Sequence, residues 1–571
     1  GGGVWPRSAK SIPVSAQVRE VLGLGSDVTA MTPAELMKAI LLAPVDLLWN
    51  GGIGTYVKSS EETNADAGDK ANDAIRVNGE DLRARCIGEG GNLGFTQLGR
   101  VEYARYGAGG SGGRMNTDFI DNSAGVDTSD HEVNIKILLD VVAAAGELAA
   151  PAERDPLLAS MTDEVATRVL QDNIDQNILL TVEAGHGAAM LPALGRLMRA
   201  LEASAGLVRA LEALPDDSEL AALGLEGQAL TRPELAVLVA YTKLDLKEAL
   251  LAGPLPDEPF AEPWLVDYFP DALAQRFGAR LTSHPLRRQI IATGLVNELV
   301  NRGGVSYALR ATEESGAGPA EIVRAFAVST GVFGLRDLWR RIDAHEGTVP
   351  SEALKALRTE VSRLLDRATR WLLQTRGGTL DVPGEIERFR GVVDELSGDV
   401  PALLVGIELE RLERRIADFV AAGVPADLAG EVAALLDVFS MLDIVEIARR
   451  TDEAPRMVAE LYFAISERYE VDRFLGRITA LPRRDRWSTL ARAALRSDLY
   501  GALASLTAKV VRATPQGGAP ADRVLAWEQR YAEGLGRAQA TLAEIGAQET
   551  FDLATLSVAL RVIRTLAMQG G

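Results

Sequence analysis

Three short polar segments of this sequence carry residues suited to binding a flat ligand that bears an amide group. They are Asn50-Gly51-Gly52, Gly90-Gly91-Asn92 and the stretch around Asn122. Paired glycines remove side chains, so that a planar ring can approach the backbone. An asparagine amide both donates and accepts hydrogen bonds, as a carboxamide ligand would require. Each segment alone also fits ordinary turn chemistry, so the hypothesis depends on the three segments meeting.

Ser129 is a candidate for binding an anionic group. The order Ser129-Asp130-His131-Glu132 reads as a capping box that opens a long helix ending near residue 148. Free N–H groups and the helix dipole at such a terminus favour a carboxylate or a phosphate. The capping box by itself explains the same residues, and both interpretations stay open.

Four carboxylates crowd the third segment, and their side chains could have raised pKa values or orient their neighbours. They are Asp118, Asp121, Asp127 and Asp130. His131, in the expected first helical turn, favours a structural role over a catalytic one. Cys86 lies in an apolar run and is expected to be a core residue.

Each polar segment follows a short apolar run, which predicts three βα units. The expected strands are 45–49, 84–88 and 115–120, and the expected helices after the first two are 65–77 and 95–103. Strands that alternate with helices indicate a parallel sheet. In such a sheet all three polar loops emerge at the carboxyl edge, where ligands bind. The sequence therefore predicts that the three segments converge on one site.

Helices dominate the rest of the chain. Two precede the first strand, at 14–24 and 32–42, and the second starts with the capping box Thr32-Pro33-Ala34-Glu35. After residue 148 the clearest helical patterns cover 161–183, 192–214, 232–251, 286–301, 319–330, 349–376, 386–397 and 453–469. We expect an α/β part followed by an all-α part: a partial Rossmann-like domain at 1–148 and a helical domain at 149–571, with a possible sub-boundary near 252–263.

Composition narrows the class of protein. The 571 residues carry a net charge of −20, which argues against a nucleic-acid partner. A single cysteine fits a reducing compartment, and the four histidines show no metal-ligand spacing. Apolar runs fall short of a membrane span, and no signal peptide is recognised. We therefore expect a soluble, cytoplasmic protein without a resident metal or a membrane partner.

The usual phosphate-binding motifs are missing from this sequence. There is no G-x-G-x-x-G after a strand with an acidic residue about 20 residues later. There is also no P-loop lysine and no H-E-x-x-H. Only one half of a dinucleotide-binding fold is recognisable from the residues.

Three stretches closely resemble the large bacterial NAD-dependent glutamate dehydrogenases. They are residues 46–57 (Asp-Leu-Leu-Trp-Asn-Gly-Gly-Ile-Gly-Thr-Tyr-Val), 88–97 (Gly-Glu-Gly-Gly-Asn-Leu-Gly-Phe-Thr-Gln) and 116–134, which contain Asn122 and Ser129. The opening residues 1–12 and the segment 231–238 are similar to the same family. The resemblance covers essentially the whole chain, as the C-terminal portion of the longer family subunit.

The resemblance implies the oxidative deamination of L-glutamate to 2-oxoglutarate and ammonia, with NAD as the cofactor. It implies that Asn92 and Asn122 border the nicotinamide and the substrate, with Gly51 and Gly52 near the nicotinamide. Ser129 would hold the side-chain carboxylate of glutamate. The small glutamate dehydrogenases differ just after Asn92, where this chain continues Leu-Gly-Phe-Thr, so contacts beyond Asn92 do not transfer.

By the same resemblance, the catalytic lysine and aspartate and the phosphate-binding turn belong upstream of residue 1. We therefore expect this chain alone to be inactive, and the complete subunit to form a homo-oligomer. Two other hypotheses stay open. The chain could be an acidic helical module for oligomerisation or regulation, capped by a non-catalytic α/β part, or it could belong to another amino-acid dehydrogenase.

Overall fold

The computed structural model describes residues 3–147, 151–482 and 485–568. The chain divides into two compact units, Gly1–Val305 and Ser306–Gly571, each described here by itself. The predicted boundary at residue 148 follows a change in composition, not this division by packing, and stays a prediction.

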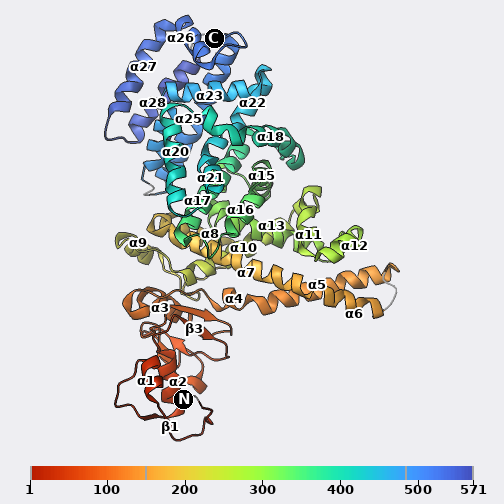
Figure 1. Ribbon diagram of the computed structural model, residues 1–571, viewed down its shortest axis with the longest axis vertical. Coiled ribbons are helices and arrows are strands. Elements are labelled where there is room, and N and C mark those ends of the chain that lie inside the picture. Colours follow the sequence, from red (N-terminus) through yellow and green to blue (C-terminus); the bar gives the residue numbers. More distant parts are fainter. Residues whose placement is uncertain (1–2, 148–150, 483–484, 569–571) are drawn as a thin grey trace. The chain divides into compact units, whose positions relative to one another are not determined.

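The α/β elements of the first unit are short parallel pairs (Figure 1). Strand β3 (Leu47–Asn50) pairs with β6 (Cys86–Glu89), with Leu47 opposite Cys86 and Asn50 opposite Glu89. Strand β4 (Val57–Lys58) pairs with β5 (Val77–Asn78). An antiparallel pair, β1 (Ile12–Pro13) with β2 (Ala30–Met31), lies nearer the N-terminus. The core beneath β3–β6 and β4–β5 is formed by Val57, Val77, Leu82, Ala84, Ile87, Phe95, Tyr103 and Met115.

Two predicted elements of this region are wrong. The expected third strand is reduced to an isolated bridge between Cys86 and Arg114, after which helix α4 (Asp118–Asp121) begins. The expected helix at 65–77 is only the 3-10 turn η1 (Lys70–Asn72). Asp69 accepts hydrogen bonds from the Thr55 N–H at 2.8 Å and the Asn72 amide at 2.6 Å, and these bonds fold the segment back on the β4 loop. Tertiary polar contacts thus override the local helical pattern.

The helices flanking the strands follow the predicted order. They are α1 (Ala16–Leu22), α2 (Pro33–Leu41) and α3 (Gln97–Gly110). The capping box of α2 is confirmed, because Glu35 accepts the Thr32 N–H at 2.8 Å while the Thr32 hydroxyl accepts the Glu35 N–H at 3.3 Å. In α3, Gly107 to Gly109 depart from helical geometry, so the helix is kinked there.

Helix α5 (Ser123–Ala144) begins six residues before the expected start at Ser129. Its N-cap is Asn122, and Ser129 lies in the second turn. The prediction that Ser129 caps this helix is therefore wrong, and the dipole argument for an anion at its N–H group falls with it. Glu132 forms an ion pair with Lys136 instead of closing a capping box.

Helices complete the first unit, and α5 runs beside α7 (Figure 1). The remaining helices here are α6 (Pro151–Ser160), α7 (Thr162–Gly185), α8 (Leu191–Ser204), α9 (Asp217–Leu225), α10 (Arg232–Leu251), α11 (Glu262–Tyr268), α12 (Asp271–Leu281) and α13 (Arg287–Gly303). Across the described residues no single helix is long and apolar enough to cross a membrane. One sharply bent pair, Glu153–Gly185 with Gly187–Ser204, meets that criterion by length and composition alone.

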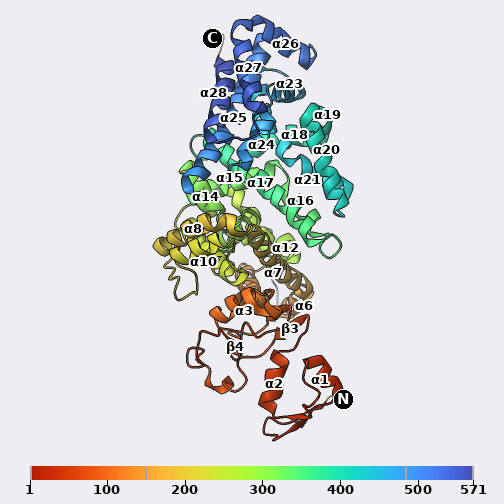
Figure 2. The same ribbon diagram turned by 90° about the vertical axis from the view of Figure 1, so that its left-hand side faces the viewer.

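The second unit is helical throughout its described residues. Its longest helices are α17 (Ser351–Thr375) and α25 (Arg486–Ala513), and α28 (Leu553–Met568) lies along α25 (Figure 2). The others are α14 (Tyr307–Ser315), α15 (Pro319–Val332), α16 (Leu335–Asp343), α18 (Val382–Leu396), α19 (Val400–Leu403), α20 (Gly406–Ala421), α21 (Ala426–Val438), α22 (Met441–Thr451), α23 (Pro455–Arg468), α24 (Val471–Ala480), α26 (Pro520–Arg530) and α27 (Ala532–Ala547). The chain is thus mostly helical with a small parallel sheet, as the sequence predicted in outline.

Candidate functional site

The three polar segments meet at the carboxyl ends of β3 and β6. The Asn122 amide donates a hydrogen bond to the Asn92 side-chain oxygen at 2.7 Å. A Cβ atom added to Gly91 would lie 2.8 Å from the carbonyl oxygen of Gly52, so only glycine allows the first two loops this approach. The convergence predicted from the sequence is therefore present in the structure.

The Trp49 indole covers the backbone of the second loop. A Cβ atom added to Gly88 or Gly90 would lie 2.6 Å from carbons of that ring, so the glycines make room for it. Trp49 is itself 59% exposed, although it follows an apolar run. The ring thus forms an apolar surface over the glycine backbone at the edge of the site.

The first loop leaves an open approach to its backbone. Gly51 and Gly52 are exposed, and Cβ atoms added to them would lie no closer than 3.6 Å to Trp49 and 3.5 Å to the Tyr56 hydroxyl. The neighbouring Asn50 amide nitrogen is buried without a hydrogen-bond partner among the described residues. A Cβ atom added to Gly94 would lie 1.7 Å from that nitrogen, so the Asn50 side chain packs against the backbone of the second loop.

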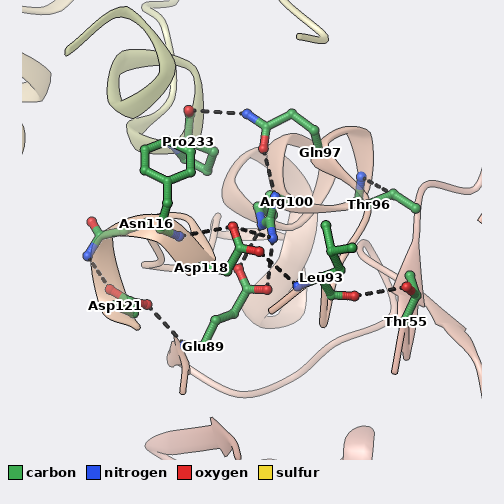
Figure 3. A network of polar contacts seen from close by, with 12 residues as sticks. Thr55, Glu89, Leu93, Thr96, Gln97, Arg100, Asn116, Asp118, Asp121 and Pro233 are labelled. Atoms are coloured by element: carbon green, nitrogen blue, oxygen red, sulfur yellow. Dashed lines mark hydrogen bonds and ion pairs between the residues drawn. The ribbon is translucent and has the colours of Figure 1, made fainter. Parts of the chain in front are cut away.

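A buried ion-pair network joins the second loop to α3 and α4 (Figure 3). Arg100 of α3 donates two hydrogen bonds to Glu89, at 2.7 and 3.0 Å, and lies 3.1 Å from Asp118. The other Asp118 oxygen accepts the Leu93 N–H at 2.8 Å, and Thr55 donates to the Leu93 carbonyl at 2.8 Å. Leu93 has a φ of +57°, a conformation that L-residues rarely adopt. The network thus holds the strained turn that presents Asn92.

Burial shifts the carboxyl groups of this network. It raises the pKa of Glu89 to about 7, against the opposing effect of the Arg100 guanidinium. Burial also raises the pKa of Asp121, whose two oxygens accept hydrogen bonds from the Asn116 amide at 2.8 Å and the Glu89 N–H at 3.1 Å. These bonds tie the third segment to the end of β6.

The start of helix α10 is hydrogen-bonded to the third polar segment, to α7 and to α3. Arg232, its first residue, donates to Asn116 at 2.9 Å and to Thr181 at 2.8 Å. Gln97 of α3 donates to the Pro233 carbonyl at 3.2 Å. Sequence reasoning noted the segment 231–238 only as a resemblance and missed Arg100 altogether. An arginine inside a helix gives no local sign of which distant carboxylates it will meet.

Ser129 lies exposed on α5 and has no hydrogen bond among the described residues. Positions seven apart lie on one face of a helix, so Ser129 falls on the face that begins with Asn122. The hydroxyl is thus available for a ligand on the Asn122 side, although it does not cap the helix.

The predictions for His131 and Cys86 have different outcomes. His131 is 3% exposed and stacks on Tyr268 with ring centroids 4.4 Å apart, which fits the expected structural role. Cys86 is exposed, so its expected place in the core is wrong. It opens β6 opposite Leu47, which is exposed too.

A cluster of titratable side chains lies between α5 and α7. The spacing of the histidines in the sequence gave no sign of it. Potential ligand atoms of Asp127, His131 and Asp172 lie within 4.8 Å of one another. Burial raises the pKa of Asp127, and it raises that of Asp172 to about 7. Lys243 lies close enough to stabilise the Asp172 carboxylate, and burial lowers its pKa to about 8. The lysine therefore offsets charge that a cation would otherwise balance.

Two family models match this chain. Residues 1–183 match the model described as bacterial NAD-glutamate dehydrogenase, catalytic domain, and residues 227–565 match the model described as glutamate dehydrogenase, C-terminal. The chain belongs to the glutamate dehydrogenase family.

Curated relatives agree with the family models. The NAD-specific glutamate dehydrogenase of Mycobacterium tuberculosis is 47% identical over 100% of this chain. The proteins of the same name from Halomonas elongata and Pseudomonas aeruginosa are 40% and 41% identical, each over 99% of the chain. The match covers 35%, 35% and 34% of these relatives respectively, so the chain spans about a third of their length.

Proposed function

We propose that this chain forms one side of the nicotinamide and substrate site of an NAD-dependent glutamate dehydrogenase. The reaction is L-glutamate, NAD and water to 2-oxoglutarate, ammonia and NADH. The observation that carries the proposal is the meeting of the Asn50–Gly52 and Gly90–Asn92 loops with Asn122, sealed by the 2.7 Å hydrogen bond between two asparagine amides. The parallel β3–β6 pair with ligand loops at its carboxyl ends supports a partial Rossmann-like arrangement within residues 1–148.

The residues at this edge fit a nicotinamide ring with its carboxamide. Gly51 and Gly52 leave the backbone open, and Asn50 packs the first loop against Gly94 of the second. Asn92 is exposed beside Asn122 and retains hydrogen-bonding capacity beyond their shared bond. NAD, when bound, would accept the hydride from glutamate. Because Gly90 and Gly91 have no side chains, the second loop does not block the approach of the ring to the Asn92 and Asn122 amides.

Ser129 is the proposed contact for the side-chain carboxylate of glutamate. Its hydroxyl is exposed on the helix face shared with Asn122, and a hydroxyl donor to a carboxylate contributes about 1–3 kcal/mol. Asn122 would then touch both cofactor and substrate. This chain is assigned no proton-transfer residue, so we expect nicotinamide binding without glutamate turnover, because the carbinolamine chemistry needs a general acid–base group.

The first test is a fluorescence titration of the 571-residue chain with NADH, together with an assay for NAD reduction by glutamate. Binding without turnover supports the proposal. Turnover would move the catalytic residues into the Asp118–Asp130 segment. Absence of both would favour a helical module for homo-oligomerisation or regulation.

Ser129→Ala in the full-length subunit tests the substrate contact. We expect glutamate kcat/KM to fall by about 5- to 150-fold, which corresponds to about 1–3 kcal/mol of transition-state stabilisation. Thr128→Ala, which removes an exposed hydroxyl from the adjacent position of α5, is the matched control and should leave kcat/KM unchanged. A loss of stability with unchanged kcat/KM would assign Ser129 a purely structural role.

A cytoplasmic location and a homo-oligomeric assembly belong to the same proposal.

A further inference from the structure

The second unit contains a cavity of 120 Å³ between α17, α22 and α25 that the proposed dehydrogenase site does not use. Three arginines line it, Arg367 and Arg370 from α17 and Arg496 from α25. Trp371 and Tyr500 supply aromatic walls. A cavity with several guanidinium groups and aromatic sides has the composition of an anion site.

The carboxylates nearest the cavity already have partners. Asp366 pairs with Arg310 at 3.0 Å and also with Arg370, and Glu314 pairs with Arg370. Arg310 and Arg370 together hold the pKa of the buried Asp366 at about 2 against the effect of burial. Two guanidinium groups therefore balance two carboxylates.

Two further arginines at the cavity have no acidic partner among the described residues. Arg367 donates to the Tyr500 hydroxyl at 3.1 Å, and no carboxylate lies within ion-pair distance of it. Arg496 has neither a hydrogen bond nor an ion pair with any residue that the structure describes, and its Nε is buried without a partner. Arg496 is close enough to lower the pKa of Asp366 and of Glu314, but it forms an ion pair with neither of them. The guanidinium groups of Arg367 and Arg496 therefore keep hydrogen-bond donors that no carboxylate of the described residues uses.

Asp443, the acid that lines the cavity, is engaged by a different group. Asp443 accepts the Trp371 indole N–H at 2.8 Å, and burial raises its pKa to about 7. Burial, reinforced by Arg367 and Arg492, lowers the pKa of Arg496 to about 9. That direction is the mark of a cation taken from water without a counter-ion. A guanidinium group stays protonated at neutral pH, so an anion that accepts hydrogen bonds from Arg496 would stabilise it.

We propose that this cavity binds a small oxyanion between Arg367 and Arg496. A guanidinium fork matches the two oxygens of a carboxylate or a phosphoryl group. The volume suits inorganic phosphate or a short organic acid, because sites for larger organic ligands usually begin near 300 Å³. Since α17 crosses the middle of the unit and contacts α14, α15, α16 and α21, an anion here would fix several helices at once.

The test is a calorimetric and thermal-unfolding titration of the 571-residue chain with sodium phosphate and, separately, with sodium succinate. Ionic strength is held constant with sodium chloride. We expect saturable binding of one ion and a rise in Tm. A response to phosphate alone identifies a phosphoryl ligand, and a response to succinate alone identifies a carboxylate.

Arg496→Gln should weaken that binding at least tenfold, because it removes the charge while keeping a side chain of similar length. Arg367→Gln is the second variant. Arg561→Gln is the matched control, since Arg561 lies exposed on α28 away from the cavity, and it should bind as the parent chain does. Equal binding by the Arg496→Gln and Arg561→Gln chains would overturn the proposal. So would the absence of any saturable response to either anion in the parent chain, a result that needs no variant to fold.

Discussion

The Asn122 amide donates to the Asn92 side-chain oxygen at 2.7 Å, and this bond joins two loops that lie 30 positions apart in the chain. Each asparagine arrives from a different element, Asn92 after β6 and Asn122 at the start of α5. The shared bond fixes the rotamers of both amides. The proposed recognition of a carboxamide requires two amides held in one defined orientation, as this bond holds them.

Substitution of this pair should show that the two amides act as a unit. Asn92→Ala and Asn122→Ala should each raise the Kd for NADH about fivefold, which corresponds to about 1 kcal/mol per hydrogen-bonding group. The double variant should be little worse than either single variant, because the first substitution already releases the partner amide. Fluorescence titration of the four chains measures this coupling. Strictly additive losses would contradict it.

Arg232 should contribute to stability more than its position at the start of a helix suggests. Its guanidinium holds Asn116 of the third segment and Thr181 of α7, in a largely buried position. Arg232→Met would leave these groups without their donor, and we expect the free energy of unfolding to fall by about 2–3 kcal/mol.

Urea denaturation followed by circular dichroism measures that change. Arg114→Met is the control, since Arg114 is exposed and its side chain has no hydrogen bond to a described residue. The control should change stability by less than about 0.5 kcal/mol. Equal effects of the two substitutions would show that the Arg232 bonds do not hold α10 in place.

Helix signals carried by adjacent residues were the most reliable part of the sequence. Helix α10 has the predicted bounds, and Glu234 accepts a hydrogen bond from the Thr231 N–H at its start. The α2 capping box is likewise local, with both partners within three residues. Such patterns specify their own hydrogen bonds and so need no knowledge of the fold.

The failures come from contacts between distant segments. Residues 65–77 have a helical pattern, yet Asp69 bonds to the Thr55 N–H and the helix does not form. The Ser129 capping box looked complete, but α5 begins at Ser123, directly after α4, whose Asp118 and Asp121 accept hydrogen bonds from the Leu93 and Glu89 N–H groups. The site loops were recognisable because polar residues follow three successive apolar runs, with paired glycines and an asparagine in the first two loops, whereas the Arg100 network depends on packing.

Gly91 and Gly125 should respond in opposite ways to the same substitution. A Cβ atom at position 91 would lie 2.8 Å from the Gly52 carbonyl oxygen, so Gly91→Ala must push the first two loops apart. We expect a loss of about 1–2 kcal/mol in stability and weaker NADH binding. Gly125, inside α5, has nothing within 4 Å of its added Cβ. Gly125→Ala should therefore stabilise the chain by about 0.5–1 kcal/mol through helix propensity. Thermal unfolding of both variants measures these changes. A loss of stability in both variants would contradict the predicted opposite effects.

Glu408 should make the second unit less stable as the pH rises. Its carboxyl group is 3% exposed, accepts a hydrogen bond from Ser466 and lies near Asp437 and Asp472. Burial is the main cause that raises its pKa to about 8, with those two carboxylates adding to the shift and Arg411 opposing it. Between the ordinary glutamate pKa, about 4.5, and 8 the folded chain therefore holds a proton that the unfolded chain releases. The stabilisation that this group contributes is fully present below pH 4.5, and it is lost as the pH rises from 4.5 to 8.

Glu408→Gln removes the titration while keeping the shape and the acceptor for Ser466. We expect the variant and the parent chain to have similar stability near pH 4.5, and the variant to be more stable by about 1–3 kcal/mol at pH 8. Urea unfolding at a series of pH values measures the difference. Glu410→Gln, on the same helix and exposed, is the control and should keep the parent pH profile. A Glu408→Gln profile parallel to that of the parent would mean that Glu408 is ionised in the folded chain, with Arg411 outweighing burial.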